Sequence, residues 1–454
     1  MTCLIAEKVL CVGLPAVAVA CMIVTPSGSL GQQAAAAPPH ITLTEAIQRA
    51  KANEPLFAAS VAGQKTAAID SYLAKAALLP SVTYHNQVLF TQSNGQHSAG
   101  SSPGLQSGPI FIANNAVHEY VSQASINETI GLKQISDAKV ASANAARATA
   151  ELEISRRGLV ATVVSLYYLV ADAETKRQIL TEALQEAAAF SDLTQKREAA
   201  REVAHADAIK AQLQQQQRQR DVSDADVLAE RARLELAVLL FPDPRTSYST
   251  DPPGTPAVLP TRDEVNHLAS ENNPEIRSAL AGLKASNATV TSARAAYLPD
   301  LGLNFTYGID APQFAKRGPG PDSIKNLGYS IMGTVDIPVW DWFSTQKRVR
   351  QSEIQRDVAK VTLTAAQRRL IATIDEAYSE ATAAQNQLTL LDQSVQTAAE
   401  SLRLTKLRYT AGESTALEVV DAQNSYLSAE TARADGIVRY EAALAALQLL
   451  TGTL

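Results

Sequence analysis

Hydrophobic residues recur along the chain with two periods, one typical of long helices and one typical of strands. The helical period has steps of three and four residues, which is the spacing of coiled coils. It occurs at Leu159, Val163, Leu166 and Val170, and again at Leu388, Leu391, Val395, Ala398 and Leu402. We expect a helix from about 135 to 196, roughly 90 Å long at ~1.5 Å per residue. Flanking helices are expected near 43–79 and 205–240.

Apolar and polar residues alternate strictly in two short segments of the second half. The apolar positions there are Leu301, Leu303, Phe305, Tyr307 and Ile309, then Tyr329, Ile331, Val335 and Ile337. A weaker alternation occurs in the first half at Val82, Tyr84, Val88 and Phe90. Such strands, apolar on one face and polar on the other, are typical of strands that cross a bilayer around a watery lumen. A hairpin packed on the helices is the alternative.

Four strands per chain cannot close a transmembrane barrel. Open strand edges cannot exist in lipid, and barrels of this kind start at about eight strands. The pattern therefore predicts that the chains assemble, and three chains would give a twelve-stranded barrel.

The chain also repeats itself. Matches at an offset of 219 residues are Pro55 with Pro274 and Pro80 with Pro299, and matches at 211 are Tyr167 with Tyr378 and Gln212 with Gln423. The change of offset indicates an insertion in the first copy, between Pro80 and about Ile126. Several matches at two consistent offsets predict two copies of one structural unit.

We therefore expect a targeting segment at 1–37, a first repeat at 43–240, a linker at 241–261 and a second repeat at 262–454. Each repeat would contain a helix, a β-hairpin, a very long helix, a turn and another helix. The hairpins are expected at about 81–126 and about 300–338. The linker is dense in Pro, Ser and Thr, and Pro at that density cannot continue a helix.

The N-terminal stretch has the features of a secretory signal. Lys8 precedes an apolar run that ends at Val24, and small residues follow up to Ala37. Cleavage in the alanine run is expected, with a retained anchor as the alternative. Cys21 ends a segment that loosely resembles a lipoprotein cleavage box, which leaves lipidation open. No run of 18 apolar residues follows, so we expect no transmembrane helix downstream.

Composition narrows the function further. A formal net charge of −6 and a pI near 5.7 argue against a nucleic-acid binder. All three cysteines lie in the targeting segment, and the six histidines are scattered without metal-ligand spacing. We find no phosphate loop and no nucleophile elbow. The sequence therefore predicts neither an enzyme nor a need for a cofactor, a metal or a disulfide.

Several short motifs carry a resemblance to one family. They are Leu43-Thr44-Glu45-Ala46, Tyr297-Leu298-Pro299, Ile337-Pro338-Val339-Trp340-Asp341, Tyr409-Thr410-Ala411-Gly412 followed by Val420-Asp421-Ala422-Gln423, and the closing Leu450-Thr451-Gly452-Thr453-Leu454. In order and spacing they closely resemble the TolC family of outer-membrane channels. The sequence departs from the pattern at Arg201, which stands where the second copy has Gly412, and at Trp342-Phe343, where small residues are usual.

The resemblance implies a trimeric twelve-stranded barrel continuous with an α-helical barrel, in the outer membrane of a Gram-negative-type bacterium and extending into the periplasm. It also implies a periplasmic adaptor and an inner-membrane pump of the RND, ABC or MFS type. The function so implied is a passive duct for the efflux of small molecules. Alternatives are a type I protein secretion channel and, in a different class, a soluble periplasmic coiled-coil scaffold.

Three groups of functional residues are expected, the first two from this resemblance and the third from its position after the last expected strand. Glu418, Asp421 and Tyr409 would surround the narrow aperture. Ala411, Gly412, Glu413, Ser414 and Thr415 would form the periplasmic tip with Arg201 and Glu202. Trp340, Trp342 and Phe343 would anchor the barrel at the membrane interface.

Each group also has a plain structural interpretation. Glu418 fits a capping box with Thr415, and Gly412 fits the position after a helix end, where φ is positive. Tyr409 would cap the last apolar step of the long helix. The aromatic group would pack at the junction between strand and helix.

Overall fold

The computed structural model describes residues 39–90, 118–251, 257–311, 314–317 and 325–454. Residues 40–454 form one compact unit. The predicted targeting segment at 1–37, including Cys21, lies outside the described residues, as do residues 91–117, where most of the expected insertion falls, and part of the segment between residues 311 and 327.

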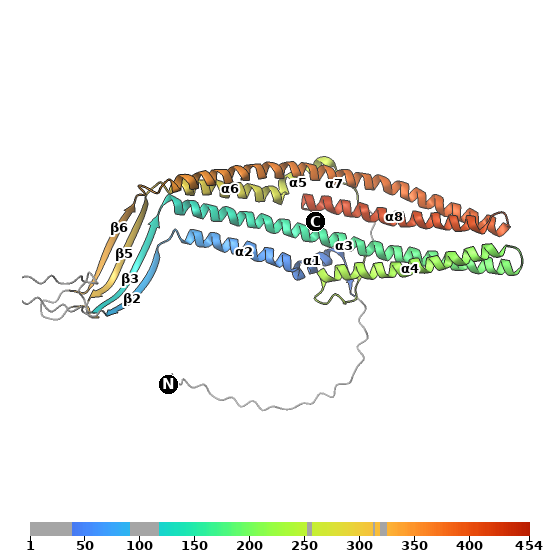
Figure 1. Cartoon of the computed structure of the whole chain (residues 1–454), viewed down its shortest axis with the longest axis horizontal. Coiled ribbons are helices and arrows are strands. Elements are labelled where there is room, and N and C mark those ends of the chain that lie inside the picture. Colours follow the sequence, from blue (N-terminus) through green and yellow to red (C-terminus); the bar gives the residue numbers. More distant parts are fainter. Residues whose placement is uncertain (1–38, 91–117, 252–256, 312–313, 318–324) are drawn as a thin grey trace, which may run out of the picture. The chain divides into compact units, whose positions relative to one another are not determined.

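The unit is rich in helices, and the elements of its two halves follow the same order (Figure 1). The first half contains α1 (Leu43–Asn53), α2 (Pro55–Ala76), β2 (Ser81–Phe90), β3 (His118–Ile130), α3 (Leu132–Ala199) and α4 (His205–Leu240). The second half contains α5 (Arg262–Asn272), α6 (Pro274–Ala295), β5 (Asp300–Ala311), β6 (Leu327–Asp336), α7 (Ser344–Ala411) and α8 (Ala416–Thr451). Corresponding helices have the same lengths, which are 11, 22, 68 and 36 residues.

The single helix expected near 43–79 is instead two helices, and this expectation was wrong. The chain is extended at Glu54, where φ is −76° and ψ is 115°. Pro55 follows as the first residue of α2, because a proline ring disfavours helical backbone at the preceding residue but suits a helix start. Asn273 and Pro274 produce the same break between α5 and α6. The sequence contained this signal, because Pro55 lies in the interior of the expected helix, where a proline marks a boundary.

The four longer strands form one antiparallel sheet in the order β2-β3-β5-β6. Phe305 of β5 lies opposite Ile331 of β6, and its ring stacks on Tyr329 at 6.4 Å between centroids. Within one chain, β2 and β6 are the two edges of the sheet. A separate parallel pair, β1 (His40–Ile41) and β4 (Ser249–Thr250), joins the start of the unit to the segment after α4.

The helices continue the order of the strands to which they connect. Helix α3 packs on α2 and α6, and α6 packs on α7, so these four helices follow the sequence α2-α3-α6-α7 (Figure 1). Beyond α2 and α6, α3 pairs with α4 and α7 pairs with α8, and α3 also contacts α8. The long helix of the first half is therefore the element on which the second half packs.

Each half has a hydrophobic core built from residues at equivalent positions. The first contains Ala46, Ala50, Val163, Val170, Ala232 and Leu236. The second contains Val265, Ala269, Ile374, Ala381, Ala443 and Leu447. Members of the two sets are separated by the offsets of 219 and 211 residues found in the sequence. A smaller cluster of Val160, Val164 and Ala445 joins α3 to α8 across the halves.

The expectation that excluded every transmembrane helix needs a correction. Among the described helices, α3 contains an 18-residue stretch with a mean hydropathy of 1.2, which suffices by length and composition. A third of this stretch is buried in the chain. Val160, Val163 and Val170 of α3 lie in the clusters described above. Packing against α1, α4 and α8 accounts for this apolar stretch.

Candidate functional site

The turn between α7 and α8 begins at a glycine in the left-handed region. Gly412 has φ of 81°, and its N–H donates to the carbonyl of Tyr409 at 3.1 Å. The N–H of Glu413 donates to the carbonyl of Arg408 at 2.9 Å. These bonds satisfy carbonyls at the end of α7, as in a Schellman motif. The motif needs a positive φ, which glycine adopts without steric cost.

The turn between α3 and α4 has the same geometry without a glycine. Arg201 has φ of 61°, and its N–H donates to the carbonyl of Glu198 at 2.8 Å. The N–H of Glu202 donates to the carbonyl of Arg197 at 2.8 Å. Replacing glycine by arginine therefore leaves the shape of the turn unchanged. The left-handed conformation costs an L-residue roughly 1–2 kcal/mol.

Glu418 is engaged in the cap of α8. Thr415 Oγ1 accepts from the N–H of Glu418, and Glu418 Oε1 accepts from the N–H of Thr415, both at 3.3 Å. Ser414 Oγ donates to Glu418 Oε2 at 3.1 Å, and Arg408 lies 3.5 Å from the same carboxylate. The backbone bond from Thr415 comes first among the causes that lower the pKa of Glu418, with Ser414 and Arg408 adding to it.

Asp421 lies three residues farther along the same helix. It is exposed, whereas the neighbouring Val420 and Ala422 are buried. Within the described residues, no hydrogen bond or ion pair engages its carboxylate, although its backbone carbonyl accepts from Ser425 Oγ at 2.9 Å. Asp421 is therefore the exposed carboxylate of the pair, and it has no side-chain partner among the described residues.

Tyr409 is buried within the chain, with 2% of its surface exposed. Its ring meets Phe190 of α3 edge to face at 5.1 Å, and its hydroxyl donates to Thr194 Oγ1 at 3.2 Å. The guanidinium of Arg197 lies 5.0 Å from the ring centroid and donates to the carbonyl of Tyr409 at 2.6 Å. These contacts join the two long helices just before their turns.

Arg197, Thr194 and Phe190 were not identified from the sequence. Arg197 also pairs with Glu202 at 3.0 Å, so it connects the α3–α4 turn to the end of α7. A signal for it existed, because Arg197 precedes Arg408 by 211 residues, the offset that relates the two turns. Comparing the repeats position by position would have selected this arginine.

The expected tip residues lie on the surface of the two turns. Ala411, Gly412, Glu413 and Thr415 are exposed in one turn, and Arg201 and Glu202 are exposed in the other. Ser414 is half-buried, because its hydroxyl is bonded to Glu418. The two turns lie close enough for Arg197 to bridge them.

The aromatic group lies between β6 and α7. Trp340 meets Trp342 at 5.8 Å and Phe343 at 5.3 Å, in both cases edge to face. The three side chains remain 64%, 83% and 57% exposed respectively, so they contact one another without entering a core. Trp342 and Phe343 both have positive φ, 57° and 64°. Bulky residues rarely adopt this conformation, and here it turns the chain from the sheet into the long helix.

No metal centre was found in the part of the chain that the structure describes. There, no group of three or more His, Cys, Asp or Glu side chains could hold an ion.

Comparison with known proteins shows a similarity to one family. A family model described as outer membrane efflux protein matches residues 265–453. The matched residues lie in the second half of the chain, and over them the chain is similar to this family. Proteins of that family are outer-membrane transport ducts.

Two relatives are similar in sequence to this chain. OprJ, an outer membrane protein of Pseudomonas aeruginosa, is 28% identical over 196 residues, which are 42% of this chain and 37% of OprJ. Protein CyaE of Bordetella pertussis is 27% identical over 404 residues, which are 86% of this chain and 79% of CyaE. The match to OprJ thus spans less than two thirds of that protein.

Solved structures have the same fold. The outer membrane protein VceC of Vibrio cholerae superposes with a TM-score of 0.76 at 17% identity, over 90% of this chain and 96% of VceC. The outer-membrane channel OprN superposes with a TM-score of 0.75 at 21% identity, over 90% of this chain and 89% of OprN.

Proposed function

We propose that this protein is the outer-membrane duct of a tripartite efflux system. It would conduct exported small molecules passively from a periplasmic adaptor and an inner-membrane pump to the exterior. One observation carries the proposal: a four-stranded sheet with two open edges continues into long paired helices, in a chain whose residues 265–453 match an efflux family. We propose no catalytic activity and no cofactor.

We propose that the duct is a homotrimer whose chains join edge to edge. The contrast between α2 and its counterpart α6 supports this. Helix α6 lies between α3 and α7 and has six buried residues, whereas α2 has only α3 as a long neighbour and one buried residue. Ile69, Tyr72 and Leu73 of α2 share one face of the helix and are each more than half exposed. An apolar face of this kind needs another chain to cover it.

The edges of the sheet support the same arrangement. Strands β2 and β6 have one unpaired side each in a single chain, and unpaired strand edges cannot exist in lipid. Pairing β6 of one chain with β2 of the next closes the barrel when three chains contribute four strands each. Equal helix lengths and equivalent cores in the two halves support an internal duplication, which would give the trimer six similar units around its axis.

We propose that the two turns form the periplasmic end of the duct. In a trimer, Glu418 and Asp421 would form two stacked rings of three carboxylates, with Tyr409 behind them joining the helices. Rings of this kind concentrate cations and disfavour anions. The exposed residues of the turns would contact the adaptor. Trp340, Trp342 and Phe343 would lie at the membrane interface, where exposed aromatic side chains are favourable.

Protein secretion is the second candidate. It is favoured by the similarity to the alkaline protease secretion protein AprF of Pseudomonas aeruginosa, which is 24% identical over 189 residues. The soluble scaffold has less support, because Val82, Tyr84 and Ile331 of the sheet are each about 70% exposed in the single chain. A water-soluble protein rarely exposes such a patch.

Membrane fractionation and planar-bilayer recording test the proposal together. We expect a detergent-stable trimer in the outer-membrane fraction that conducts ions when reconstituted. A monodisperse, water-soluble monomer in light scattering would contradict the fold assignment and the duct. A stable trimer without conductance would retain the assembly and exclude an open duct.

A further inference from the structure

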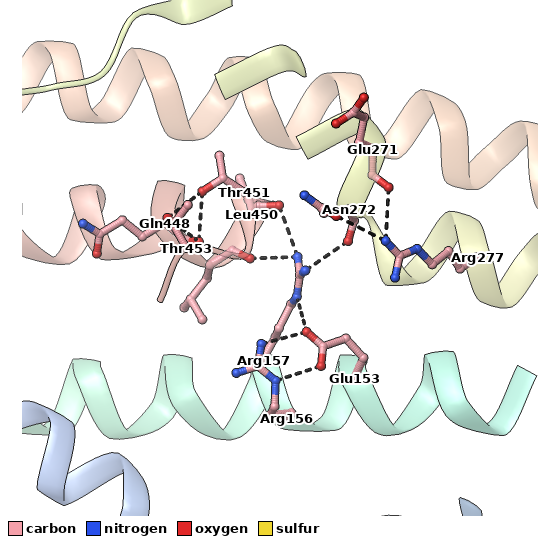
Figure 2. A network of polar contacts seen from close by, with 11 residues as sticks. Glu153, Arg156, Arg157, Glu271, Asn272, Arg277, Gln448, Leu450, Thr451 and Thr453 are labelled. Atoms are coloured by element: carbon pink, nitrogen blue, oxygen red, sulfur yellow. Dashed lines mark hydrogen bonds and ion pairs between the residues drawn. The ribbon is translucent and has the colours of Figure 1, made fainter. Parts of the chain in front are cut away.

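One arginine of the first half caps two helices of the second half (Figure 2). Arg157 of α3 donates through Nη1 to the carbonyls of Leu449, at 2.9 Å, and Leu450, at 3.2 Å, in the last turn of α8. Its Nη2 donates to the carbonyl of Asn272, the last residue of α5, at 3.0 Å. The last carbonyls of a helix lack partners in their own helix and have partial negative charge. A single guanidinium thus satisfies two helix ends.

Glu153 holds this arginine in place. Its Oε1 accepts from Arg157 Nε at 2.9 Å, and the two carboxylate oxygens accept from Arg156 at 2.7 and 2.8 Å (Figure 2). The Arg157 side chain is only 14% exposed. The cap is therefore a buried contact in which every nitrogen of the guanidinium has a partner.

The internal offsets locate the counterparts of this contact. The residue 211 positions after Arg157 is Arg368 of α7, which is again an arginine. The counterpart of Asn272 is Asn53, the last residue of α1, and the counterparts of Leu449 and Leu450 are Val238 and Leu239 in the last turn of α4. These two helix ends lie together, because Asn53 Nδ2 donates to the carbonyl of Leu240 at 2.6 Å.

Within a single chain the counterparts do not meet. Arg368 is exposed, and no hydrogen bond from it to the ends of α1 or α4 occurs among the described residues. The apolar residues beside the contact show the same difference, being buried where the contact exists and exposed at the counterpart positions. Val160 of α3 is 1% exposed beneath α8, whereas its counterpart Ile371 is 64% exposed, and Val238 of α4 is 61% exposed. One half of the contact thus lies on each free edge of the chain.

We propose that Arg368 of one chain caps α1 and α4 of the next copy, as Arg157 caps α5 and α8 within its own chain. This inference rests on the proposed homotrimer. The proposed contact repeats the α3–α8 packing between copies. The Arg368 guanidinium would donate to the carbonyls of Asn53, Val238 and Leu239 of the next copy, and Val238 of that copy would cover Ile371. Arg368 would then be a positioning residue that fixes the axial register of neighbouring chains.

Cross-linking between introduced cysteines tests this contact directly. The sequence has no cysteine after Cys21, so the parent protein is a suitable blank. We expect the Arg368→Cys/Val238→Cys variant, treated with a short bifunctional thiol reagent, to run as covalent dimers and trimers on a denaturing gel. The matched control is Arg157→Cys/Leu449→Cys, which should react to the same extent and remain at the mass of one chain.

Light scattering of the same samples separates the inference from the proposed function. An intact trimer in which only the control pair reacts would overturn the role of Arg368 and leave the duct in place. Monomers in every sample would overturn both.

Thermal dissociation of the trimer provides a second measurement if the cysteine variants do not fold. Arg368→Gln should lower the dissociation temperature by several degrees, because three buried caps are lost per trimer. Arg369→Gln is the matched control, since Arg369 is also exposed and its counterpart is Gly158, which makes no cap. Equal dissociation temperatures for the two variants would contradict the proposal.

Discussion

At the scale of single residues, the two turns show how much one position can differ without a change of shape. Gly412 and Arg201 occupy the same place in the two halves, and both have positive φ. The hydrogen bonds of the turn recur at the same spacing in each. Bonds at the helix end and the packing of Tyr409 on α3 hold the chain in place, so the turn at Arg201 keeps its form against the intrinsic preference of an L-residue.

We predict that Arg201→Gly stabilises the protein by about 1 kcal/mol, because it removes the left-handed strain at a small cost in chain entropy. Thermal unfolding followed by circular dichroism would measure this as a rise in melting temperature. The reverse change, Gly412→Arg, should lower the melting temperature by a similar amount. A lower melting temperature for Arg201→Gly would show that the arginine side chain makes a contact worth more than the strain.

At the scale of elements, hydrophobic periodicity predicted the type of each element better than the residues at which it begins and ends. The alternation along β5 and the three-four steps along α3 follow from which face each side chain presents, and this information is local. The break at Glu54 depends on Pro55. Because a proline is compatible both with the start of a new helix and with a bend within one helix, the predicted helix continued past the true boundary. The burial of Tyr409 and the cap made by Arg157 depend on residues more than 100 positions away. No local pattern contains that information.

The hydroxyl of Tyr409 is one of the contacts that link α7 to α3. We predict a small loss of stability when that hydroxyl alone is removed. In Tyr409→Phe the ring keeps its contact with Phe190. Thr194 Oγ1 still donates to the carbonyl of Phe190 at 2.8 Å, so no buried hydroxyl loses all its bonds. The loss should be about 0.5–1.5 kcal/mol. Tyr409→Ala should cost ~3–5 kcal/mol, because it leaves a cavity. Equal losses for the two variants in thermal unfolding would show that the ring contributes little.

Glu153 gives the contact between α3, α5 and α8 a pH dependence. The hydrogen bond from Arg156 is the first cause that lowers the pKa of Glu153, from an ordinary 4.5 to about 2. A carboxyl whose pKa is lower in the folded protein stabilises the fold above its ordinary pKa, and this contribution is lost as the pH falls toward the folded value. It is therefore complete near pH 7 and disappears between about pH 4.5 and pH 2.

We predict that Glu153→Gln lowers the melting temperature at pH 7 and that the difference from the parent protein narrows as the pH falls through this window. Glu151→Gln is the matched control. Glu151 pairs with Arg147 at 3.0 Å, but both side chains are about half exposed, and exposed pairs contribute little. If the melting temperatures of Glu153→Gln and the parent protein differ by the same amount at every pH, the packing of the side chain, and not its charge, causes the loss of stability.

At the scale of the whole molecule, the single chain has two edges whose backbone groups and apolar side chains lack partners. Strands β2 and β6 each have one unpaired side, and α2 packs on one long helix only. A duplicated chain whose first half packs on its second can repeat the same packing with another copy. In the proposed trimer, closure would remove every open strand edge, and the turns of all copies would meet around one axis.

In the proposed trimer, one of the two carboxylates near the start of α8 would have the larger effect on ion flow. Glu418 is already bonded to Thr415 and Ser414 and lies beside Arg408, so much of its charge is compensated within the chain. The carboxylate of Asp421 has no such partner among the described residues and is exposed. In a ring of three, the Asp421 side chains would set the potential at the entrance. We predict that Asp421→Asn lowers cation selectivity and weakens block by multivalent cations in planar-bilayer recordings. Folding should survive, since no core contact is lost.

Glu418→Gln is the matched comparison on the same helix. Glutamine keeps an oxygen that can accept from the N–H of Thr415, so the cap should survive and selectivity should change less than in Asp421→Asn. Both variants should remain trimers in light scattering, so that a change in conductance reports charge and not assembly. If Asp421→Asn leaves selectivity and block unchanged in an intact trimer, Asp421 faces away from the lumen. The two carboxylates would then serve only the start of α8 and its solvated face.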